Sequence, residues 1–140
     1  MVADVLRRLR ETGCAVLLDG ERLVLERPDP SPPGTQAALA VLREQREEAR
    51  ALLAEVAAHL RARCCRSPRA WVEADRLHAD YTVHGGLLDR ATYLAALLAD
   101  GRAALTPGGT VAHVGLARDW PAEDGGTLRR ARRVGGRRGR

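Results

Sequence analysis

Four residues of metal-binding type lie close together in the sequence: His59, Cys64, Cys65 and His78. Imidazole nitrogens and thiolates are the usual ligands of structural zinc, and such sites usually contain cysteines in CxxC pairs. Here the spacing is H-x4-CC-x12-H, with two adjacent cysteines and no CxxC pair. Adjacent cysteines are poorly placed to share one tetrahedral ion, so we interpret both as small buried or boundary thiols. The sequence therefore predicts no metal and no other cofactor.

Residues with nucleophilic chemistry are equally scarce. Only Ser31 and Ser67 offer serine hydroxyls, and each lies beside a proline in an expected connector, with no visible base. The chain contains no lysine and no GxxxxGK[ST] phosphate-binding loop. Glutamates and arginines alternate at helical spacing over residues 43–50, which is typical of a solvated helix face. We therefore expect a non-enzymatic protein.

Nucleic acid binding is suggested by the end of the chain. The net charge is +5, but residues 1–128 hold sixteen arginines against eighteen acidic residues, so only the tail is strongly basic. The tail over 121–140 is expected to be disordered and to attract phosphate backbones without reading sequence. A frayed, solubilising chain end is the alternative. The tail residues expected to contact nucleic acid are Arg129, Arg130, Arg132, Arg133, Arg137, Arg138 and Arg140.

The first 63 residues predict the element order helix, strand, strand, helix, helix. A short leucine-rich helix is expected to begin near Asp4, as a possible N-cap, and to end at Gly13. The four prolines of residues 28–34 mark a stiff connector. The helical pattern over 35–63 has two apolar clusters separated by a polar stretch, so two helices with a break near Gln45 are as compatible with it as one long helix.

Between the first helix and the connector, CAVLLDGERLVLER predicts a β-hairpin that turns at Asp19-Gly20. One face of this ribbon is rich in leucine and valine and should cover the helices. The other face is mildly apolar, and two unpaired strand edges remain, which together suit strand addition by a protein partner or self-association. The residues expected to bind the partner are Ala15, Leu17, Arg22 and Val24.

The run from about residue 3 to residue 53 resembles the TubC N-terminal docking domain family. The resemblance rests on LRRLRETGCAVLLDGERLVLE, a proline-rich gap and LAVLREQREEARALL. It implies a small αββαα docking fold, often dimeric, whose exposed hairpin receives a peptide from a partner protein. In assembly-line synthases that peptide is the tail of the preceding subunit. Similar domains also occur in short bacterial proteins of mobile elements.

Residues 68–120 predict a helix-helix-hairpin module. Ser67 and Pro68 suggest the start of a helix to Tyr81 that buries Trp71, a second helix follows Asp89, and a hairpin surrounds residues 106–109. This order resembles the latter part of a winged helix, with the second helix in the reading position. Packing or protein interaction is the alternative. The nucleic-acid contacts expected from this module are Arg90, Thr92, Tyr93 and Arg102.

Together these features predict an α+β protein with an αββαα docking-like module (1–63), a winged-helix-like module (68–120) and a disordered arginine-rich tail. No stretch approaches the length of a membrane span, and few cysteines suit a reducing compartment, so we expect a cytoplasmic, homodimeric protein without membrane contact. The favoured function is docking of a protein partner on the N-terminal hairpin. A further expectation is association with nucleic acid. The alternative is a DNA-binding accessory or regulatory protein of a bacterial mobile element or replication system.

Overall fold

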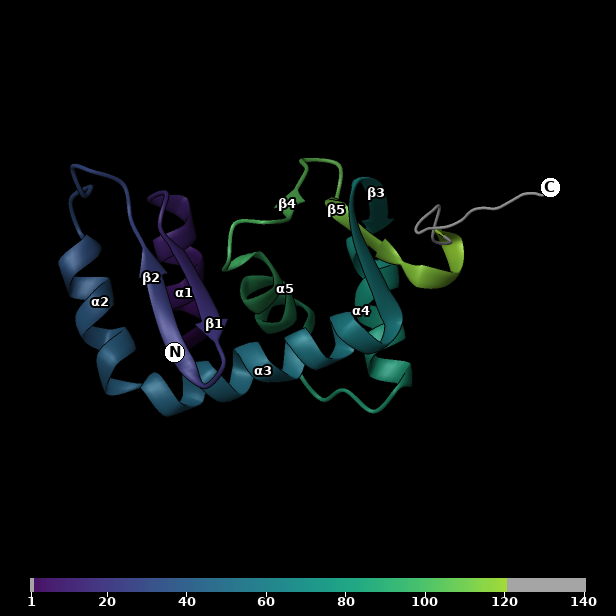
Figure 1. Cartoon of the computed structure of the whole chain (residues 1–140), viewed down its shortest axis with the longest axis horizontal. Helices are drawn as coiled ribbons and strands as arrows, with labels where there is room; N and C mark the ends of the chain where they lie inside the picture. The colour runs from purple at the N-terminus through teal and green to yellow at the C-terminus, as the bar shows by residue number, and fades with distance from the viewer. Residues whose placement is uncertain (1, 121–140) are drawn as a thin grey trace.

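The computed structural model describes residues 2–120 and confirms a mixed α+β fold (Figure 1). The N-terminal elements follow the expected order of helix, two strands and two helices. They are α1 (Val2–Glu11), β1 (Ala15–Asp19), β2 (Arg22–Glu26), α2 (Thr35–Glu44) and α3 (Arg46–Arg63). Gly13, with φ of 89°, ends the turn after α1, and Asp4 lies inside the first turn rather than at its cap. Of the two alternatives left open for residues 35–63, the structure has two helices, with the break at Gln45.

The hairpin is present, but its turn lies one residue later than expected. Asp19 pairs with Arg22, so the two-residue loop is Gly20-Glu21. Gly20 has φ of 65° and takes the first loop position, where a type II′ turn needs a positive φ that glycine adopts without strain. Leu17 therefore pairs with Val24 instead of Arg22. This shift by two residues keeps the same side chains on each face.

The C-terminal elements form a second, three-stranded sheet with two helices. They are β3 (Cys64–Glu73), α4 (Ala74–Val83), α5 (Arg90–Leu98), β4 (Ala104–Leu105), β5 (Thr110–Leu116) and the 3-10 turn η1 (Ala117–Asp119). The sheet is antiparallel with the order β3-β5-β4. Asp89 caps α5 as expected, because its carboxylate accepts a hydrogen bond of 2.8 Å from the Thr92 N–H.

The helix expected over residues 68–81 is wrong in its first part. Residues Cys64–Glu73 form strand β3, which pairs with β5, and α4 begins only at Ala74. Trp71 was expected to be buried on that helix, but its side chain is 54% exposed on the strand. Ser67 and Pro68 are residues that favour the start of a helix locally. The strand that pairs with β3 is β5, far along the chain, so no local signal indicates the pairing.

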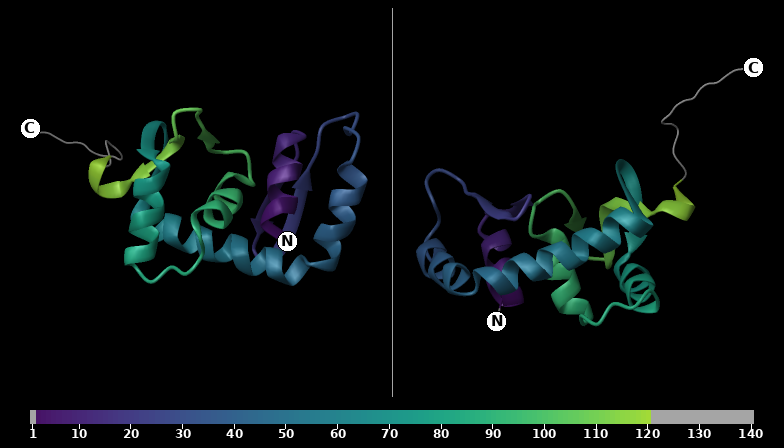
Figure 2. Two further views of the ribbon diagram at one scale, coloured as in Figure 1. Left: turned by 180° about the vertical axis from the view of Figure 1, so that it is seen from behind. Right: turned by 60° about the horizontal axis from the view of Figure 1, so that its bottom comes forward.

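One hydrophobic core connects both halves of the chain. Its buried members run from Val2 in α1 to Leu116 in β5 without a division between the expected modules. Helix α1 contacts α5, and α3 extends beneath both the hairpin and the second sheet (Figures 1 and 2). Among residues 2–120, no helix has both the length and the apolar character needed to cross a membrane.

We predict that Leu6→Ala destabilises both halves together. Leu6 is fully buried in α1, so its truncation should lower the free energy of unfolding by about 2–5 kcal/mol. Both tryptophans lie in the C-terminal half, so tryptophan fluorescence during urea unfolding reports on that half, while far-ultraviolet circular dichroism reports on all helices. The two transitions should shift equally. A fluorescence transition that stays in place would show that the halves unfold separately, and Leu87→Ala, at a 94% exposed residue, is the matched control.

Candidate functional site

A buried polar cluster joins helices α3, α4 and α5. His59 Nε2 donates to the Asp80 carboxylate at 2.9 Å, since a carboxylate only accepts. In the neutral ring, His59 Nδ1 then accepts the Tyr93 hydroxyl at 2.6 Å. The Arg63 guanidinium holds both oxygens of Asp80, at 3.2 and 3.3 Å. Every hydrogen-bonding atom of this Asp80-His59-Tyr93 chain therefore has a partner inside the protein.

The electrostatics of the cluster favour an ionised Asp80. Burial alone would raise the pKa of Asp80, but hydrogen bonds from Arg63 and His59 outweigh it and lower the pKa from 3.8 to about 2. Burial also raises the pKa of the Tyr93 hydroxyl, followed by the nearby Cys64 and Asp80. Tyr93 is completely buried and does not line the groove described below. The polar groups of the cluster thus pair with one another and connect α3, α4 and α5.

A second set of hydrogen bonds fixes the segment between α4 and α5. The Tyr81 hydroxyl donates to Glu55 and accepts the N–H groups of Leu87 and Leu88. The backbone of Gly86 passes so close to the Tyr81 ring that a Cβ atom there would lie 2.2 Å from it. Through these contacts Tyr81 holds α4 and the segment before α5 against α3.

The four residues of metal-binding type do not meet. Within residues 2–120, no three His, Cys, Asp or Glu side chains gather as a ligand set. His59 is engaged by Asp80 and Tyr93, and His78 Nε2 donates to the Leu88 carbonyl at 2.8 Å. Burial raises the pKa of the Cys64 thiol to about 12, so this thiol is a poor nucleophile as well as a poor ligand.

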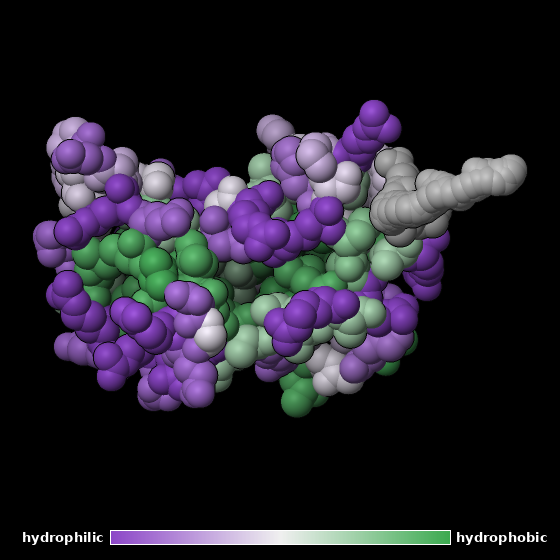
Figure 3. Space-filling model, in the orientation of Figure 1, coloured by the Kyte–Doolittle hydropathy of each residue, from purple (hydrophilic) through white to green (hydrophobic). Residues whose placement is uncertain are grey.

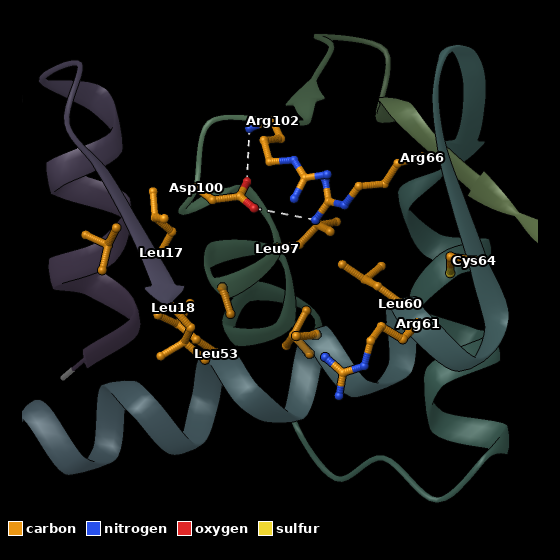
Figure 4. Close-up of a pocket in the computed structure, with 14 residues that line it drawn as sticks. Leu17, Leu18, Leu53, Leu60, Arg61, Cys64, Arg66, Leu97, Asp100 and Arg102 are labelled. Atoms are coloured by element: carbon orange, nitrogen blue, oxygen red, sulfur yellow. Dashed lines mark hydrogen bonds and ion pairs between the residues drawn. The ribbon is translucent and has the colours of Figure 1, made fainter. Parts of the chain in front are cut away.

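A groove of about 480 Å³ separates the hairpin from the start of β3 (Figure 4). Its lining comes from β1, from α3 and the first residues of β3, which are continuous in sequence, and from α5 with the turn that follows. Its apolar residues include Leu17, Leu18, Leu53, Val56, Leu60 and Leu97. In Figure 3, apolar residues cover the hairpin and line the hollow beside it, with hydrophilic residues around them. We call this hollow the arginine groove, after the charged residues of its rim.

Three guanidinium groups and one carboxylate line the arginine groove: Arg61, Arg66, Arg102 and Asp100. Arg66 and Arg102 point toward one another, with Asp100 beside them, and Arg61 lies on the opposite rim (Figure 4). Asp100 contacts Arg66 Nη2 at 3.5 Å and accepts the backbone N–H of Arg102 at 2.9 Å.

The Arg66 side chain is only partly satisfied. Its Nη1 atom is buried and has no hydrogen-bond partner within residues 2–120. Burial lowers the pKa of Arg66 and outweighs the attraction of Asp100, which raises it. A desolvated guanidinium with a spare donor favours a second carboxylate or another anion.

The edge of β1 that faces this groove is not paired with another strand in the described part of the chain. In an antiparallel ladder, alternate residues direct both backbone groups away from the partner strand. The Val16 N–H points outward, because it donates to the Ala99 carbonyl at 2.8 Å. Leu18, two residues further along, therefore presents its N–H and C=O on the same outer edge, beside the groove.

The structure separates the four residues that were expected to bind a partner. Leu17 lines the arginine groove, while Ala15, Arg22 and Val24 do not. Arg22 is exposed, and Ala15 and Val24 are half-buried. The turn at Gly101 approaches Ala15, since a Cβ on Gly101 would lie 3.8 Å from the Ala15 methyl group. The outer hairpin face is thus partly covered near its α5 end.

The residues expected to contact nucleic acid are also dispersed. Tyr93 is fully buried against His59, so it is corrected from a reading residue to a core residue. Arg90 is exposed and pairs with Asp75 at 2.6 Å, and Thr92 is half-buried in the first turn of α5. Arg102 belongs to the arginine groove. The seven tail arginines lie outside the described residues.

Sequence reasoning missed Arg61, Arg66 and Asp100. Arg61 sits among many arginines in a helical pattern, and Arg66 was assigned to a boundary rather than a strand. Their significance depends on β1, α3, β3 and α5 meeting in space, which no local spacing indicates.

No protein-family model, curated protein or solved structure matches the chain.

We predict that Asp80→Asn removes an acid-sensitive part of the stability. Because the pKa of Asp80 is lower in the folded state, its contribution is complete above about pH 4 and is lost as the pH falls toward about 2. At neutral pH the variant should be less stable by about 1–3 kcal/mol, since the amide has no charge and offers His59 and Arg63 one acceptor oxygen in place of two. When urea unfolding is measured across this pH range, the free energy of unfolding should decrease less with falling pH in the variant than in the wild-type protein. An equal decrease in both proteins would contradict the assignment, and the exposed Glu48→Gln is the control.

Proposed function

We propose that this protein is a non-enzymatic docking protein that binds an extended, acidic segment of a partner protein in the arginine groove. The observation that carries this proposal is the combination in one groove of an apolar floor, a free strand edge and three arginines against one aspartate. The apolar floor can bury side chains of an extended peptide, the strand edge can pair with its backbone, and the arginines can neutralise its negative charge.

The strand edge supports binding of an extended chain rather than a helix. A bound segment alongside Leu18 gains backbone hydrogen bonds that the isolated edge lacks, and its alternate side chains point to the floor of the groove. The Val16 N–H is already used by Ala99, so the segment pairs with the loop end of β1. The resemblance to TubC docking domains supports the same use of the hairpin, and a homodimer is part of that expectation.

The charge of the groove supports an acidic occupant. Asp100 alone faces Arg61, Arg66 and Arg102, so the groove carries excess positive charge. A carboxylate from a partner can pair with Arg102 and with the part of the Arg66 guanidinium that lines the groove. Such a contact is stronger here than at the open surface, because Arg66 is partly removed from water.

We predict that Arg66→Gln with Arg102→Gln weakens binding of a labelled peptide of alternating leucine and glutamate by at least about tenfold. Both guanidiniums are lost from one side of the groove, and each charge-assisted bond contributes about 1.5–3 kcal/mol. Fluorescence anisotropy measures the affinity, and a leucine-glutamine peptide shows how much of it depends on charge. Arg43→Gln, at an exposed arginine of α2, is the matched control.

Two further variants separate the groove from the outer face of the hairpin. Leu17→Asp and Val24→Asp introduce the same charge at paired positions, but only Leu17 lines the groove. Leu17→Asp alone should abolish binding. Equal loss in both variants would place the site on the outer hairpin face, and equal binding of the acidic and neutral peptides would overturn the acidic partner.

Duplex DNA binding is the second candidate, favoured by one observation. The order α3, β3, α4, α5, β4, β5 with the sheet order β3-β5-β4 is similar to that of a winged helix. The position of α5 would then be that of the reading helix. Its exposed polar contact is Arg90, because Tyr93 is buried and Ala91 and Ala95 carry no hydrogen-bonding side chain.

If α5 contacts a duplex, Arg90→Gln should reduce the slope of log affinity against log salt concentration by about one. Anisotropy with a short duplex over a salt series measures that slope, with Arg43→Gln as the control. An unchanged slope would exclude Arg90 from the contact.

A further inference from the structure

Both tryptophans of the chain meet on one exposed part of the second sheet. Trp71 on β3 is 54% exposed, and its ring centroid lies 6.3 Å from that of Trp120 in an edge-to-face arrangement. The Trp120 indole N–H donates to the Trp71 carbonyl oxygen at 3.2 Å. We call Trp71, Trp120 and their flanking arginines, Arg69 and Arg118, the tryptophan patch.

The backbone beneath the patch holds these rings in place. Gly115 in β5 lies directly under Trp120, where a Cβ atom would approach the ring to 2.3 Å. Trp71 pairs with Ala112 of β5, which in turn pairs with Ala104 of β4. Small side chains therefore continue from Trp71 across the sheet.

Positive charge accompanies each tryptophan. Arg69 and Arg118 each stand two residues before a tryptophan, in the sequences RAW and RDW, and both side chains are exposed. Neither forms an ion pair with any residue in the range 2–120. Asp119, between Arg118 and Trp120 in sequence, pairs with Arg76 at 2.7 Å. Glu73, at the end of β3, is the exposed acid nearest in sequence to Trp71.

We propose that the tryptophan patch binds single-stranded nucleic acid, with an unpaired base stacked on Trp71 and the adjoining phosphates near Arg69 and Arg118. Indole rings stack on every base, and arginines attract the backbone, so the combination binds single strands with little sequence preference. A base pair inside a duplex does not expose its face to such a ring. The patch is separate from the arginine groove, and this proposal does not depend on protein docking.

The charge and shape of the patch favour this occupant over a protein segment. An isolated exposed tryptophan with two unpaired arginines offers one aromatic platform and two anion contacts, without the apolar floor of the arginine groove. Stacking uses the ring surface that stays open to solvent, and Trp71 remains 54% exposed beside Trp120. Binding of DNA and RNA strands shares this chemistry, so the test includes both.

The first measurement is quenching of intrinsic fluorescence in the full chain by oligothymidylate and by oligouridylate. Both tryptophans belong to the patch, so quenching reports on it directly. Trp71→Ala should lower the affinity, measured by anisotropy, at least about fivefold, while Trp71→Phe should keep most of it. Arg69→Gln should reduce the salt slope by about 0.7. Preference for one of the two oligomers would identify the source of the strand.

Three outcomes would overturn the proposal. Unchanged affinity of a folded Trp71→Ala variant would assign any binding to charge alone. Equal competition by a duplex would show that no unpaired base is needed. Quenching by the acidic leucine-glutamate peptide but not by either oligomer would assign the patch to a protein partner. Leu87→Ala, at another exposed apolar residue far from β3 in sequence, controls for general loss of apolar surface.

Discussion

Helix α3 packs against the hairpin and also against β3 and α5, and the rest of the structure depends on this double packing. Its N-terminal half places Ala49 and Leu53 in the core beside the hairpin, and its C-terminal half brings His59 and Leu60 toward β3 and α5. Halves of this size bury too little apolar surface to be very stable alone. Because α3 and the contact of α1 with α5 join them, one core stabilises the whole chain.

The position of the arginine groove follows from the same arrangement. The hairpin and the second sheet both rest on α3 but do not meet above it, so the groove lies between them with Leu53, Val56 and Leu60 as part of its lining. The buried Asp80 cluster fixes α4 and α5 on α3. Charged groups that stabilise the fold are thus fully paired, whereas those of the groove are in excess. This difference distinguishes a structural polar cluster from a binding surface.

Local signals in the sequence predicted most elements, and tertiary pairing explains the failures. Gly13, Asp89 and the TPGG turn act through their own backbone geometry, so the helix end, the helix cap and the second hairpin were correct. Strand β3 was missed because Ser67 and Pro68 favour a helix start, and only its pairing with β5 overrides them. The hairpin turn lies one residue later than predicted, because only its first loop position, Gly20, has a positive φ. Of the groove lining, the sequence analysis named only Leu17 and Arg102 as site residues, because the lining comes from segments that no local spacing connects.

The direct junction between α3 and β3, at Arg63 and Cys64, also bears on how such a chain can be inherited. No linker separates the two halves at this point, and both the core and the groove cross it. A recombination event at this junction would exchange one wall of the groove and leave the other without its neighbours. The hairpin and the second sheet are therefore expected to be inherited as one unit, so that the arginine groove diverges by point substitution rather than by exchange of halves.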